Sequence, residues 1–134
     1  MERAVQELRV VVTAPDYEAA VAFYRDALGM PELAAYRTAT TRVVILDAGC
    51  ATLEIADPAH AAFVDDIEVG RRVAGQIRIA LQVASASDAT ERAVAAGAEL
   101  IAAPTVTPWQ SLNARLAGPA GLQLTLFEQL EREF

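Results

Sequence analysis

The chain has 134 residues, of which 54% are hydrophobic, so it is long and apolar enough for one compact domain over residues 1–134. No apolar run approaches the roughly 18 residues that span a bilayer. Its formal net charge of −7 argues against nucleic-acid binding, which needs a basic surface. Cys50 is the only cysteine, which excludes an intramolecular disulfide, and the mixed-charge start MERAVQELR does not resemble a secretory signal, so we expect a cytoplasmic protein.

The first half of the chain predicts a strand, a helix and three further strands. The strand covers residues 8–14, and Asp16 follows it where a helix N-cap belongs. The helix ends at Gly29, and its apolar residues recur at helical spacing, which predicts that they pack on a sheet: Ala20, Phe23, Ala27 and Leu28. The further strands are expected at residues 33–37, 41–47 and 51–56.

The second half repeats this order after a connector. Residues 57–76 start with Asp-Pro and carry many charges, which predicts an exposed connector with one helical turn. His60 lies in it and is interpreted as a solvated residue rather than a catalytic base. A strand at 77–83 and a helix at 86–96 follow, with further strands at 100–103, 111–116 and 122–128. We therefore expect module one at about 6–56 and module two at about 77–128.

We expect the two modules to pack against each other, because neither is large enough to bury its apolar face alone. Strand alternation separates an aliphatic face, such as Leu8 and Val10, from a mixed face, such as Arg9 and Val11. The aliphatic faces should meet the helices, and the mixed faces should line a concave pocket. Alternation also places Asn113 and Arg115 toward the pocket, with weaker lining candidates at Tyr36, Gln82, Gln123 and Phe127.

Several segments carry a resemblance to a known family: TAPDYEAAVAFYRDALG, ATLEIAD, IRIALQV, AVAAGAE and NARLAGPAGLQLTLFE. Together they resemble the vicinal oxygen chelate superfamily, which contains glyoxalase I, bleomycin-resistance proteins and extradiol dioxygenases. The resemblance implies an α+β fold in which two βαβββ modules form an open, curved mixed sheet around a concave pocket, with helices on the outer face. It also implies a homodimer, and leaves open whether modules pair within one chain or between two.

Metal-dependent members of the superfamily carry ligands at positions that match Arg9, Glu54, Arg78 and Thr125 here. Only Glu54 has the expected kind of side chain. Arginine stays protonated and offers no lone pair to a cation. We therefore expect no metal and no other cofactor. The two arginines either grip an anionic ligand group or form an internal salt bridge with Glu54 that fills the site.

The resulting prediction is a metal-independent small-molecule-binding protein, with sequestration of an antibiotic or metabolite as one form of that function. Its partners are a small-molecule ligand and a second copy of the chain, with no nucleic acid and no membrane. The alternative is a lyase, isomerase or dioxygenase-like enzyme, for which Glu54 is the best catalytic candidate. Trp109 either stacks on a ligand or packs in a core or dimer interface. The predicted ligand-binding residues are Arg9, Glu54, Arg78, Trp109, Asn113 and Thr125.

Overall fold

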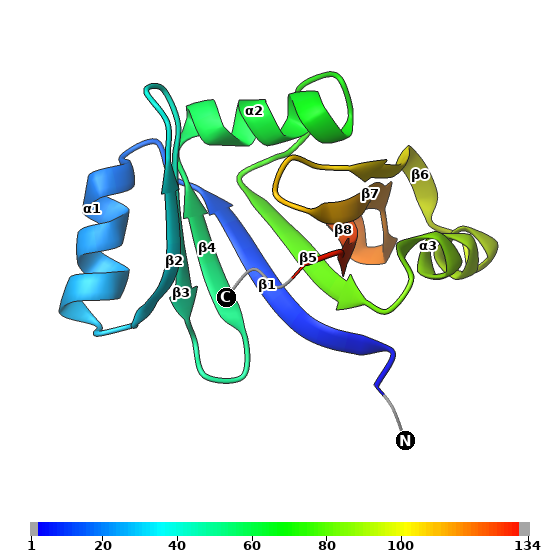
Figure 1. Cartoon of the computed structure of the whole chain (residues 1–134), viewed down its shortest axis with the longest axis horizontal. Coiled ribbons are helices and arrows are strands. Elements are labelled where there is room, and N and C mark those ends of the chain that lie inside the picture. Colours follow the sequence, from blue (N-terminus) through cyan, green and yellow to red (C-terminus); the bar gives the residue numbers. More distant parts are fainter. Residues whose placement is uncertain (1–2, 132–134) are drawn as a thin grey trace.

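The computed structural model describes residues 3–131 and shows one mixed eight-stranded sheet with helices packed against it (Figure 1). Residues 1–2 and 132–134 of the expected domain lie outside the described residues. The first half contains β1 (Val5–Thr13), α1 (Tyr17–Val21), the π-helical η1 (Ala22–Ala27), β2 (Glu32–Arg37), β3 (Arg42–Asp47) and β4 (Thr52–Ala56). After α2 (Pro58–Glu68) come β5 (Ile77–Val83), α3 (Ala86–Ala95), β6 (Glu99–Val106), β7 (Ser111–Ala117), the short 3-10 helix η2 (Pro119–Gly121) and β8 (Gln123–Gln129). The expected α+β fold is confirmed.

The two halves of the sheet are related by an approximate twofold axis between β1 and β5. The strand order is β2-β3-β4-β1-β5-β8-β7-β6, so the strands of the second half follow in the reverse of the order in the first half. The two halves meet where β1 and β5 pair antiparallel within the chain. Val11 pairs with Arg78 on β5 and with Glu54 on β4. At the equivalent place, Ala80 pairs with Arg9 on β1, and it pairs with Thr125 on β8. This register makes Arg9 the counterpart of Arg78, and Glu54 the counterpart of Thr125.

Aliphatic strand faces pack under the helices, as alternation predicts, except on β1, where Leu8 is 37% exposed and Val10 is half-buried. Val44, Leu46 and Ile55 form one buried cluster with Val21 of α1. A second cluster joins β5, β7 and β8 to α3: Val83, Ala86, Ala89, Ala114, Leu116 and Leu126. The opposite strand faces turn toward the concave side, where Val11, Ala80 and Phe127 pack together.

The prediction of which residues of the first helix pack on the sheet is wrong beyond the first turn. Asp16 does cap the helix, because its carboxylate accepts a hydrogen bond from the Ala19 amide at 3.0 Å. The following turn is π-helical, and the wider turn changes which residues face the sheet. Val21, the last residue of α1, is buried, whereas Phe23 and Leu28 are 53% and 60% exposed.

The connector also differs from the expectation of an exposed path with one helical turn. Asp57 caps α2 by accepting from the His60 amide, and Pro58 occupies its first turn, where a missing amide hydrogen has no cost. The helix runs for 11 residues and lies across one end of the sheet, between the two halves (Figure 1). Its face toward the sheet buries Ala61, Val64, Asp65 and Glu68. Within residues 3–131, no helix is long and apolar enough to cross a membrane.

Candidate functional site

A cavity of about 560 Å³ lies on the concave side of the sheet, within the size range of small-molecule sites. Both halves of the sheet and α2 contribute to its walls. The residues predicted to bind a ligand all line it: Arg9, Glu54, Arg78, Trp109, Asn113 and Thr125. Tyr36 and Phe127 line it too, whereas Gln82 and Gln123 are not among its lining residues. The structure thus brings the predicted set together, and their binding of a ligand stays a prediction.

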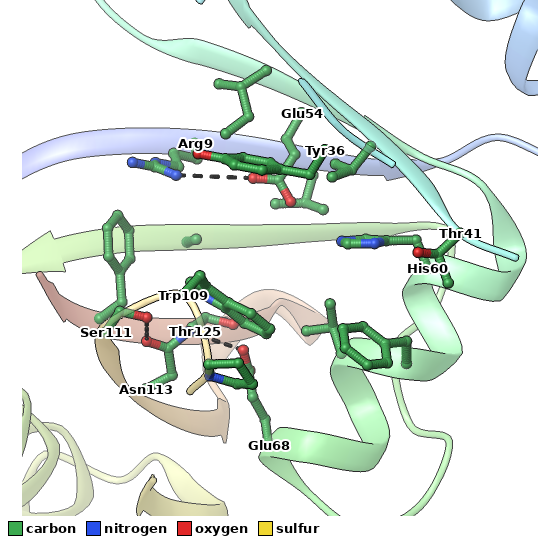
Figure 2. Close-up of a pocket in the computed structure, with 18 of the residues that line it drawn as sticks. Arg9, Tyr36, Thr41, Glu54, His60, Glu68, Trp109, Ser111, Asn113 and Thr125 are labelled. Carbon is green, nitrogen blue, oxygen red and sulfur yellow. Dashed lines mark hydrogen bonds and ion pairs between the residues drawn. The ribbon is translucent and has the colours of Figure 1, made fainter. Parts of the chain in front are cut away.

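Arg9 is held on the cavity wall by acidic and aromatic neighbours. Its guanidinium forms an ion pair with Glu7, and its Nη1 lies 4.0 Å from Oε1 of Glu54 (Figure 2). The guanidinium also stacks 4.7 Å from the ring centre of Phe127, a cation–π arrangement. Arg9 is 5% exposed, so these contacts fix its position. The internal salt bridge considered for this arginine is therefore present in the structure.

Arg78 has a different environment, although it is the counterpart of Arg9. Its Nη1 donates a hydrogen bond of 2.7 Å to Oγ1 of Thr125, a neutral partner. Desolvation lowers the pKa of Arg78, and the positive charge of Arg115 lowers it further. The carboxylates of Glu68, Glu54 and Asp65 act in the opposite direction. The guanidinium stays protonated, because arginine does not deprotonate in proteins.

Arg115 is a structural residue, not the cavity-lining residue that strand alternation predicted. It is fully buried, and its Nη1 donates to Oδ1 of Asp65 at 2.7 Å and to Oε1 of Gln123 at 2.8 Å. Its Nη2 donates to Oε1 of Glu68 at 2.8 Å. Asp65 and Glu68 belong to α2, so this network attaches the connector helix to β7 and β8.

Asn113 faces the cavity and takes part in the same network. Its Nδ2 donates to Oε2 of Glu68 at 2.9 Å, and its Oδ1 accepts from Ser111 Oγ at 2.6 Å (Figure 2). The Ser111 hydroxyl lies 3.0 Å from that of Thr107. All these side chains are buried, so the chain of hydrogen bonds fixes the amide orientation of Asn113.

An aromatic row forms another wall of the cavity. The rings of His60 and Phe63 on α2 have centroids 6.0 Å apart, and Phe63 lies 6.4 Å from Trp109. Figure 2 shows the ring of His60 reaching from α2 into the space between Glu54 and Trp109. The interpretation of His60 as a solvated connector residue is wrong. Burial lowers the pKa of His60, an effect that the charge of Arg78 strengthens and that of Asp57 opposes, so the imidazole is neutral at pH 7.

Sequence reasoning missed His60, Asp65 and Glu68 as site residues because it treated the connector as exposed. A usable signal was present: Asp57-Pro58 is a cap followed by the favoured first helical residue. The spacing of His60, Val64 and Glu68 then places these three on one helix face.

The side chains of Arg9, Glu54, Arg78 and Thr125, which the resemblance matches to the superfamily's metal ligands, do not fit a metal. Arg78 points a donor at Thr125, and Arg9 lies beside Glu54, so only Glu54 offers a ligand oxygen of the usual kind. Two guanidinium charges at this place would also repel a cation. Among the described residues there is no group of three or more His, Cys, Asp or Glu side chains arranged to hold a metal ion.

The sequence model of the glyoxalase/bleomycin resistance protein/dioxygenase superfamily matches residues 8–126, and the chain belongs to this superfamily. No curated protein sequence matches the chain.

Solved structures show the same fold at low identity. A hypothetical protein from Bacillus halodurans C-125 has 16% identity and a TM-score of 0.73, with 97% of this chain and 98% of that chain covered. A methylmalonyl-CoA epimerase from Streptomyces coelicolor, in complex with 2-nitronate-propionyl-CoA, has 18% identity and a TM-score of 0.68, with coverages of 98% and 99%. The corresponding epimerase from Mycobacterium tuberculosis has 17% identity and a TM-score of 0.63, with coverages of 96% and 89%. At these identities the likeness establishes the fold, and an activity needs its own evidence.

Proposed function

We propose that this protein binds a small organic molecule in the concave cavity and does so without a metal ion. The observation that carries the proposal is the pair Arg78–Thr125, a cation and a hydroxyl at positions where metal-dependent members of the superfamily hold ligands. A cavity of about 560 Å³ with aromatic walls supports it, because small-molecule sites combine apolar walls with a few fixed polar groups. Sequestration of an antibiotic or a metabolite is the physiological role that this binding would serve.

The second candidate function is an isomerase or lyase that moves a proton without a metal. Two groups favour it: Glu54, a carboxylate on the cavity wall, and His60, a neutral imidazole in the same cavity. Either group can accept a proton from a substrate carbon or oxygen atom. The structural likeness to methylmalonyl-CoA epimerases makes CoA esters suitable test substrates.

A thermal-shift screen of metabolites and antibiotics, carried out on protein purified without chelators, tests the first function. If a compound still binds after the protein has been treated with a chelator, its binding does not depend on a metal ion, which supports the proposal. Incubation of each hit in deuterated water, followed by mass spectrometry, separates the two functions: an isomerase or lyase exchanges or converts its ligand, and a binding protein returns it unchanged. Loss of all binding on chelation would contradict the proposal.

A further inference from the structure

Two arginines at twofold-related positions of the cavity, Arg9 and Arg78, differ in the charge of their neighbours. Arg9 has Glu54 as its carboxylate neighbour on the adjacent strand. Arg78, at the equivalent position, has Thr125 instead. The second half thus keeps the arginine and replaces the carboxylate by a hydroxyl, so Arg78 forms no ion pair with a carboxylate of residues 3–131.

The hydrogen bonds of Arg78 leave donors available. A guanidinium has five N–H donors, and within residues 3–131 only Nη1 of Arg78 donates, to Thr125. No carboxylate of the described chain forms an ion pair with Arg78. Arg78 lines the cavity, and its Nε and Nη2 form no hydrogen bond within residues 3–131, so these nitrogens can donate to a bound ligand.

Of the three carboxylates that line the cavity, Glu54 and Glu68 already have partners, and Glu131 is exposed to solvent. Glu68 accepts from Arg115 through Oε1 and from Asn113 through Oε2. Glu54 lies beside Arg9. A cationic ligand would have to compete with these arginines, whereas an anionic ligand would meet available N–H donors on Arg78. Electrostatic complementarity therefore favours an anion, although the net charge of the chain is −7.

The walls of the cavity define the rest of the ligand. Phe63 and Trp109 lie 6.4 Å apart and are part of the lining, as is Phe127. Aromatic faces of this kind favour a flat apolar body over a branched or strongly polar one.

We propose that the cavity binds small planar carboxylates, with the ligand anion held by the guanidinium of Arg78 in the place of a metal ion. The inference rests on the proposed function and specifies its ligand class. A carboxylate fits because two parallel N–H donors of a guanidinium match its two oxygens.

The test uses probes that differ in charge and shape. Benzoate, benzamide and benzylamine form one set, and 2-naphthoate, 2-naphthamide and 2-naphthylmethylamine form another; cyclohexanecarboxylate tests planarity. Isothermal titration calorimetry gives the affinities. Fluorescence of Trp109, the only tryptophan, reports whether benzoate binds in this cavity. We expect the carboxylates to bind about 10- to 100-fold more tightly than their amides, the amines to bind most weakly, and cyclohexanecarboxylate to bind more weakly than benzoate.

Two variants locate the anion. Arg78→Met should remove the preference for carboxylate over amide, whereas Arg92→Met, which removes the same charge from the exposed outer helix α3, should leave it unchanged. Thr125→Asp gives Arg78 the carboxylate partner that Glu54 gives Arg9, and it should weaken benzoate binding by a similar factor. Where a variant does not fold, as judged by circular dichroism, the ranking of the probes on the unmodified protein decides.

The results separate this inference from the proposed function. Amides or amines that bind as tightly as carboxylates, or a carboxylate preference that persists in Arg78→Met, would overturn the anion site while leaving small-molecule binding intact. Absence of binding by every probe up to millimolar concentration would also overturn it. The metabolite screen tests the proposed function independently, because its hits can have any charge.

Discussion

Replacement of Asp65 by asparagine should strongly destabilise the protein. Oδ1 of Asp65 accepts from Arg115 at 2.7 Å. Its Oδ2 accepts from Arg72 at 2.6 Å and from the amides of Val73 and Ala74 at 2.9 and 2.8 Å. The side chain is 1% exposed, so water cannot replace a lost partner. Asparagine has one acceptor oxygen, and its NH2 group would point at one of these donors.

The size of the effect follows from the burial of the pair. Removing one partner from a buried ion pair costs about 3–5 kcal/mol, and Asp65 is a partner of both Arg115 and Arg72. Arg115 is 0% exposed and would keep only Glu68 as a charged partner. For a domain of this size such a loss lowers the melting temperature by about 10–20 °C.

Asp66 provides the matched control. It is the next residue of α2 and is exposed, so Asp66→Asn makes the same chemical change outside the network. Urea unfolding followed by circular dichroism measures the free energy of unfolding of both variants. We expect a change within about 0.5 kcal/mol for Asp66→Asn. A loss below about 1 kcal/mol for Asp65→Asn would show that the Arg115 network does not stabilise the fold, contrary to our argument from burial.

Three further predictions concern the metal, the assembly and the pH dependence. Elemental analysis should find no stoichiometric nickel, zinc, iron or manganese, and about one such ion per chain that is lost in Glu54→Gln would contradict our assignment. Light scattering at micromolar concentration should show a homodimer, because β2 and β6 are unpaired sheet edges within the described chain and Phe23 and Leu28 are exposed; a monomer would refute this. Burial lowers the pKa of His60 in the folded state, so below its usual pKa of about 6.5 the unfolded chain takes up the proton first and stability falls as the pH falls. His60→Gln should reduce this decline between pH 6.5 and 5 in urea unfolding, and an unchanged pH profile would show that His60 is not desolvated.

The strand faces were predictable from sequence because alternation depends on only one geometric rule. A strand turns successive side chains to opposite sides, so Arg9 and Glu54 had to lie on one face once their strands were located. The match between the halves supplied the register, and the pairing of Val11 and Ala80 agrees with it.

The helices were less predictable, since their packing depends on contacts distant in sequence. The π-turn of η1 changes the side that Phe23 faces, and a pattern with a period of 3.6 residues does not contain that change. In α2, Asp65 and Glu68 look like solvated charges. Their burial makes sense only with Arg115, which lies about fifty residues further along the chain. A sequence pattern within α2 alone could not reveal that partner.

The position of α2 connects the stability of the fold with the proposed binding. The connector helix α2 occurs once in the chain and has no counterpart under the twofold relation. It therefore makes the cavity asymmetric, although the two modules are related by an approximate twofold axis. Its turn-by-turn spacing places His60, Val64 and Glu68 on the face that lines the cavity, and the ion pairs of Asp65 and Glu68 with Arg115 hold that face in place. A weakened network should therefore reduce both stability and affinity, because the aromatic wall moves with the helix. A change at Arg78 should reduce affinity for an anion alone. The two effects separate the residues that build the cavity from the residue that selects the ligand.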